Sequence, residues 1–128
     1  MTLNALDFSA KFVEAAPALR EAVSDLFLYW EPDSPPVTSL YGVIGKDVAA
    51  KFDGFSHFEK EKIFALIEEA LRGDDEMLGN AVATGLLEAL VIRVGEDLGL
   101  WSRIDIYLGA EAREYVDAWN AWCFRTPS

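Results

Sequence analysis

Apolar residues recur every three or four positions along most of the chain, and this spacing predicts helices. No stretch of strand length alternates cleanly between apolar and polar positions. We therefore expect an all-α fold, in one compact domain of five to seven helices that covers residues 1–128. The predicted helices cover residues 8–16, 17–30, 38–52, 56–72, 75–94, 102–108 and 110–124.

Start and stop residues support these boundaries. The connection 31–36 contains three prolines, which cannot continue a helix. Ser56 followed by Glu59 matches the capping box of a helix N-terminus, and Gly73 is expected at the C-terminal end of the same helix. Gly42 and Gly45, inside a predicted helix, either weaken that helix or permit close contact with a neighbouring one.

The segment 60–90 resembles one unit of a HEAT-type repeat. It combines two antiparallel helices, an acidic turn and an alanine-rich second helix. The second helix is apolar on almost every face, which indicates a central place in the core. A single unit cannot bury its own face, so we expect the other helices to cover this central hairpin.

Composition adds an acidic surface to this picture. The chain has 22 Asp and Glu against 11 Lys and Arg, a formal net charge of −11, yet 52% of its residues are hydrophobic. Binding of nucleic acid or anionic lipid requires clustered cations, so we expect neither nucleic acid nor membrane as a partner. A basic protein partner is favoured by complementary charge, although acidity also serves solubility alone.

Residues that carry chemistry are sparse. The chain has a single cysteine, Cys123, and a single histidine, His57, so a disulfide within the chain and a cysteine-based zinc site are excluded. Phosphate-binding loops and the common hydrolase and metalloprotease motifs are absent. We expect no enzymatic activity, no metal and no cofactor. The lack of a signal peptide pattern and of 18 uninterrupted apolar residues predicts a cytoplasmic protein.

An acidic cluster lies at the turn of the predicted hairpin. It could dock a basic partner or hold a hard cation, but its spacing matches no EF-hand loop. Its structural explanation is helix capping, with carboxylates placed favourably at the start of the next helix. The candidate contact residues in this cluster are Glu68, Glu69, Asp74, Asp75 and Glu76.

The last predicted helix carries an aromatic stripe. Tyr115, Trp119 and Trp122 are spaced so that they share one face. The stripe is explained by core packing, by a partner interface in which Trp119 and Trp122 are the apolar anchors, or by the contact of a homodimer. Glu88 is the acid that an enzyme alternative would use, and Asn80, two turns earlier, is expected on the same side.

Two segments carry a family resemblance. Residues 80–90 (NAVATGLLEAL) and 108–115 (LGAEAREY), followed by Ala118 and Trp119, resemble a family of small acidic bacterial helical domains of unknown function. The family usually has Pro and Ser where this chain has Ala110 and Ala112. The resemblance implies no enzyme activity and no established site, and such domains are similar to bacterial immunity proteins by analogy.

These observations lead to one functional hypothesis with two alternatives. We expect a non-catalytic, acidic protein-binding module, such as a toxin-immunity or antitoxin-like inhibitor of a basic partner. The first alternative is a structural homo-oligomeric helical protein. The second is an enzyme that uses Glu88 in a pocket between helices.

Overall fold

The computed structural model describes residues 4–94 and 97–123, without the side chains of Leu98, Trp122 and Cys123. Within these ranges the chain forms seven helices, if Glu76–Val94 is counted as one, and no strands. The prediction of an all-α fold is confirmed. The helices are α1 (Ala5–Ala15), α2 (Arg20–Trp30), α3 (Val37–Lys51), α4 (His57–Arg72), α5 (Glu76–Asn80) with α6 (Glu88–Val94), α7 (Leu98–Asp105) and α8 (Ala110–Cys123), with short 3-10 turns at Pro17–Leu19 and Phe52–Gly54.

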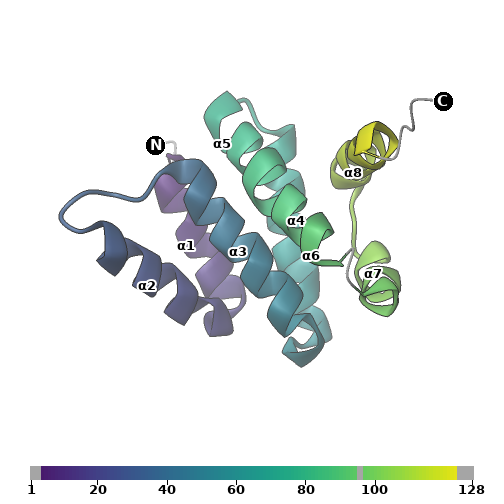
Figure 1. Cartoon of the computed structure of the whole chain (residues 1–128), viewed down its shortest axis with the longest axis horizontal. Coiled ribbons are helices and arrows are strands. Elements are labelled where there is room, and N and C mark those ends of the chain that lie inside the picture. The colour runs from purple at the N-terminus through teal and green to yellow at the C-terminus, as the bar shows by residue number, and fades with distance from the viewer. Residues whose placement is uncertain (1–3, 95–96, 124–128) are drawn as a thin grey trace.

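The predicted hairpin lies in the middle of the molecule. The turn after Arg72 reverses the chain, so that α4 and the helix Glu76–Val94 run antiparallel. Figure 1 shows α1, α2 and α3 on one side of the long helix and α7 and α8 on the other. Every helix contributes to one core, whose largest fully buried side chains include Phe12, Leu19, Tyr41, Ile44, Ile63, Leu86 and Ile104.

The long helix Glu76–Val94 packs most extensively against α3. Its length of 19 residues and mean hydropathy of 1.5 would suffice to cross a membrane, but half of that apolar window is buried inside the protein. Gly45 permits the close approach, since a Cβ there would lie 3.0 Å from the Leu86 carbonyl carbon. A Cβ at Gly85 would lie 2.7 Å from the Thr38 carbonyl oxygen. Of the two roles expected for Gly45, close helix contact is therefore the observed one.

The middle of this helix, Ala81–Leu87, is π-helical, which the sequence pattern does not predict. The Thr84 hydroxyl donates a hydrogen bond to the Asn80 carbonyl oxygen at 2.7 Å, at the start of the widened segment. A hydroxyl that bonds to the preceding turn competes with the regular backbone ladder. The segment connects α5 to α6 and faces α3.

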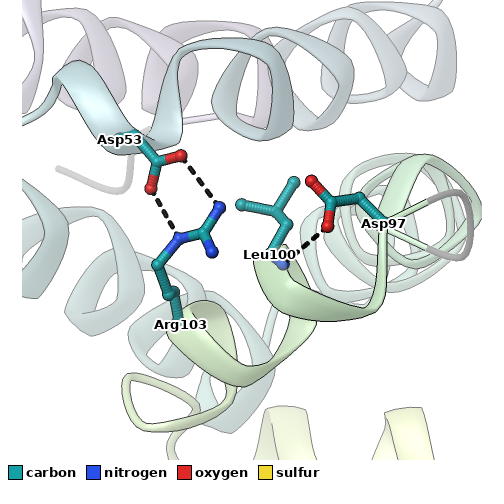
Figure 2. Close-up of polar contacts among 4 residues, drawn as sticks. All are labelled: Asp53, Asp97, Leu100 and Arg103. Atoms are coloured by element: carbon teal, nitrogen blue, oxygen red, sulfur yellow. Dashed lines mark hydrogen bonds and ion pairs between the residues drawn. The ribbon is translucent and has the colours of Figure 1, made fainter.

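Several predicted helix ends are confirmed. The Ser56 hydroxyl accepts the Glu59 backbone N–H at 3.1 Å, and the Glu59 carboxylate accepts the Ser56 N–H at 2.9 Å. Gly73 caps α4. The helix predicted at 102–108 instead starts earlier, at Leu98, because the Asp97 side chain accepts the Leu100 N–H at 3.1 Å (Figure 2).

An exposed ion pair joins α7 to the 3-10 turn Phe52–Gly54, which follows α3. The Arg103 guanidinium donates two hydrogen bonds to the Asp53 carboxylate, at 2.8 and 2.9 Å (Figure 2). These hydrogen bonds hold the pKa of Asp53 below its ordinary value. Because both side chains are exposed, we assign the pair a role in positioning α7 and not in overall stability.

Candidate functional site

Glu68, the first residue of the predicted acidic cluster, points into the protein. Its side chain is only 7% exposed. Its two carboxylate oxygens accept the backbone N–H groups of Glu111 at 3.0 Å and Ala112 at 2.8 Å. Glu68 thus caps the N-terminus of α8 from another helix, where a negative charge also meets the positive end of the helix dipole. Its carboxylate is committed inside the fold and does not face solvent.

Gly109 provides the space for this carboxylate. A Cβ at Gly109 would overlap the carboxyl carbon and the Cγ of Glu68. Glycine is needed here for room, because no described glycine has a positive φ. The sequence contained a signal for the burial of Glu68, since it lies one turn after Phe64 on the apolar face of α4.

Of the other carboxylates in the acidic cluster, two form a hydrogen bond or an ion pair, and two are exposed without an ion pair among the described residues. Asp75 caps α5 by accepting the Leu78 N–H at 3.1 Å, as the capping explanation requires. Glu69 forms an ion pair with Lys11 at 3.4 Å, with both side chains partly exposed. The remaining members, Asp74 and Glu76, are exposed, and within the described part of the chain no ion pair engages either.

The aromatic stripe of α8 is anchored at its first member. The Tyr115 hydroxyl donates a hydrogen bond to the Glu88 carboxylate at 2.6 Å. Partial burial and this hydrogen bond raise the pKa of the Tyr115 phenol. Trp119 is half-buried one turn further on. The side chain of Trp122 lies outside the described residues, so its predicted role as an anchor stays a prediction.

A groove brings the end of α4 together with α8. Its volume is about 320 Å³, and its floor is formed by Leu71, Tyr115 and Ala118. The charged residues that line it are Glu111 and Glu114, both acids and both exposed. In the chain, Arg72 and Gly73 separate Leu71 from the first acid of the turn, Asp74. Of the α8 stripe, Tyr115 lines the groove, and none of the candidate residues of the acidic cluster does.

Glu88 lines a second depression, of about 300 Å³, between α3 and the long helix. Lys46 and Arg93 contribute its cations, and small residues form most of its wall. Asn80 does not line it and is exposed, so the structure does not bring Asn80 and Glu88 together there. The Glu88 carboxylate is hydrogen-bonded to Tyr115, as described above, and no histidine or cysteine lines the depression.

His57 has partners that sequence reasoning missed. Its Nδ1 lies 2.7 Å from the Tyr107 hydroxyl, and its Nε2 lies 3.1 Å from the Glu61 carboxylate. Tyr107 comes from the turn after α7, 50 residues away, so no local motif could signal it. The linked side chains of Tyr107, His57 and Glu61 lie at the surface, where the His57 side chain is 72% exposed. It ties α4 to the turn after α7.

Across residues 4–94 and 97–123, no group of three or more His, Cys, Asp or Glu side chains is arranged to hold a metal ion. The family resemblance of the segments 80–90 and 108–115 stays a prediction. No family model matches the chain, and comparison with curated proteins and with solved structures finds no match.

Proposed function

We propose that this chain is a non-catalytic, acidic module that binds a basic protein. The observation that carries the proposal is the groove between α4 and α8, which has an apolar floor and only acids, Glu111 and Glu114, as charged lining. A lysine or arginine side chain suits such a groove. Its methylene stem can pack on Leu71 and Ala118 while its charged head meets the carboxylates.

The surroundings of the groove favour the same class of partner. Asp74 and Glu76 are exposed at the turn after α4 and add negative charge there, next in the chain to the exposed cation Arg72. Met77, 65% exposed, adds an adaptable apolar contact beside them. With a formal net charge of −11, the chain also attracts a cationic protein over a distance before contact forms.

An inhibitor of a nuclease toxin fits this chemistry. A nuclease must bind phosphate, so its active site presents cations that an acidic surface can cover. An antitoxin or immunity role is therefore the specific form of the proposal that we favour. It would require no catalytic residue in this chain, only the acidic groove and its rim.

The test compares two charge reversals on α8. Glu114 lines the groove and Asp117, three residues later, does not, although both are exposed. Wild type, Glu114→Lys and Asp117→Lys are immobilised and exposed to lysate of the source cells, and the retained proteins are identified by mass spectrometry. We expect a basic protein to be retained by wild type and Asp117→Lys and lost by Glu114→Lys.

The second measurement is how strongly the wild type retains the basic protein as the salt concentration rises. A contact formed by charge pairs should weaken strongly between about 50 and 300 mM salt, because the Debye length shortens. Equal retention of the same proteins by wild type and Glu114→Lys would contradict the proposal. Sedimentation of the wild type alone tests the alternative of a homodimer, whose apolar contact at Trp119 would persist at high salt.

A further inference from the structure

The second helix presents an unusually apolar outer end. Of the residues of α2, only Val23 is buried. At its C-terminal end Leu28 is 63% exposed and Tyr29 is 81% exposed, and Trp30 packs edge-on against Tyr29. Large aromatic side chains are the commonest anchors of protein interfaces, so their exposure together at one helix end calls for a covering partner.

A groove lies between α1 and α2, and its last lining residue on α2 is Phe27, which precedes Leu28 in the chain. It has a volume of about 590 Å³. One wall comes from α1 and the other from α2, which runs back along it after the turn Pro17–Leu19. The apolar lining consists of Leu6, Ala10, Val13, Val23 and Phe27.

Acids outnumber cations around the groove. Asp7 and Glu14 line it, and Arg20 is the only cation that does so. Between Arg20 and Lys46 the chain has no lysine or arginine. The exposed acids in this segment are Glu21, Asp25, Glu31 and Asp33. An occupant of this surface must therefore combine an apolar face with positive charge.

We propose that the groove between α1 and α2, together with the exposed end of α2, docks a basic amphipathic helix of a protein partner. This inference rests on the proposed function and adds a second contact to it. Both α1 and α2 have 11 residues. The groove can thus hold about three turns, or roughly 16 Å, of a helix. Such a helix would place its apolar stripe on the groove floor and its lysines near Asp7 and Glu14.

The two surfaces can be tested separately. Figure 1 shows α1 and α2 on the opposite side of the long helix from α8. The probe is a synthetic amphipathic peptide of leucine and lysine, about 14 residues long, which is about four turns of helix. Titration of the ¹⁵N-labelled protein with this peptide is followed by amide chemical shifts. We expect the shifts to concentrate in α1 and α2.

A matched pair of variants tests the anchors. Leu28→Ser with Tyr29→Ser removes two exposed apolar side chains from the proposed surface, and Phe58→Ser with Ile106→Ser removes two from elsewhere, exposed by 63% and 76%. The first variant should weaken peptide binding at least about tenfold, as expected for loss of interface anchors, and the second should leave it unchanged. All four side chains are exposed, so both variants should fold, which circular dichroism checks.

Three results would overturn the inference. The first is that shifts concentrate at α4 and α8, which would leave the proposed function in place and remove the second contact. The second is that the peptide does not bind, or that both variants bind it equally. Neither result bears on the proposed function, which the capture experiment with Glu114→Lys tests independently. The third is that zwitterionic phosphatidylcholine vesicles shift the amides of α1 and α2 more than the peptide does, which would make the occupant a lipid surface.

Discussion

Glu68→Ala should detach the N-terminus of α8 from the rest of the protein. The substitution removes both acceptors of the Glu111 and Ala112 backbone N–H groups. It also removes the negative charge from the start of the helix dipole. The N–H groups that lose their partner lie beside a largely buried side chain, so water can replace the carboxylate only if α8 moves.

The expected cost follows from these two hydrogen bonds. A hydrogen bond to a charged group contributes about 1.5–3 kcal/mol, and loss of a helix cap costs about 0.5–2 kcal/mol. The two bonds at 3.0 and 2.8 Å are not independent, and removing the carboxylate also relieves its desolvation. We therefore expect Glu68→Ala to lower the free energy of unfolding by about 2–4 kcal/mol.

Gly109→Ala provides a partner for a double-mutant cycle. In the wild type the new methyl group must push the Glu68 side chain off α8. Its cost should thus approach that of Glu68→Ala itself. In the Glu68→Ala background the obstructing atoms are gone, so Gly109→Ala should cost under about 0.5 kcal/mol. The two substitutions should be strongly non-additive.

Urea denaturation of the four proteins, followed by circular dichroism at 222 nm, measures the cycle. The prediction is a coupling of about 2 kcal/mol or more between the two positions. Additive losses would refute the reasoning, because they would show that the Glu68 carboxylate does not occupy the space beside Gly109. So would a loss below about 0.5 kcal/mol for Glu68→Ala alone.

Three further predictions follow from other contacts. Gly45→Ala should lower the free energy of unfolding by about 1–3 kcal/mol, measured by thermal denaturation, because its Cβ would meet the backbone of Leu86. In Gly42→Ala the nearest atom to the new Cβ lies 3.9 Å away, so that substitution should be neutral or raise the free energy of unfolding by up to about 1 kcal/mol. The pKa of Tyr115 is raised in the folded protein, so above about pH 10 the phenol ionises in the unfolded chain first and the free energy of unfolding falls as pH rises. Tyr115→Phe should reduce this pH dependence of the free energy of unfolding, measured by urea denaturation. Arg103→Gln should raise the pKa of Asp53 toward its ordinary value in a ¹³C carboxyl titration by NMR, and an unchanged pKa would mean that the pair does not persist in solution.

Much of the fold follows from local pattern. The spacing of apolar residues predicts each helix. Ser56 with Glu59 caps the start of α4, and Asp75 caps the start of α5 by accepting the Leu78 N–H, as these residue types indicate. These features depend on residues close in the chain, where side-chain chemistry determines backbone geometry directly. The apolar spacing places the start of α7 at residue 102, whereas the Asp97 side chain caps a helix that starts at Leu98.

The candidate site was harder to predict, because its contacts join distant segments. The acidic cluster was read as one unit, but burial separates Glu68 from its exposed neighbours. The partner of Glu88 is 27 residues away, and a pattern of polar spacing cannot identify Tyr115 as that partner. The π-helical segment is equally hidden, since its apolar residues also fit an α-helix over so short a length.

The way in which α8 is held has a consequence for binding. This helix packs mainly against α4 and the π-helical segment, and Glu68 secures its first turn. The groove at Leu71 and Tyr115 exists only while α8 is docked, so a partner in that groove binds the docked form alone. Occupancy must then slow amide hydrogen exchange throughout α8, by a free energy that grows with the logarithm of partner concentration. Hydrogen exchange in α8 and the affinity of the proposed partner would then both report on the same docking equilibrium of α8.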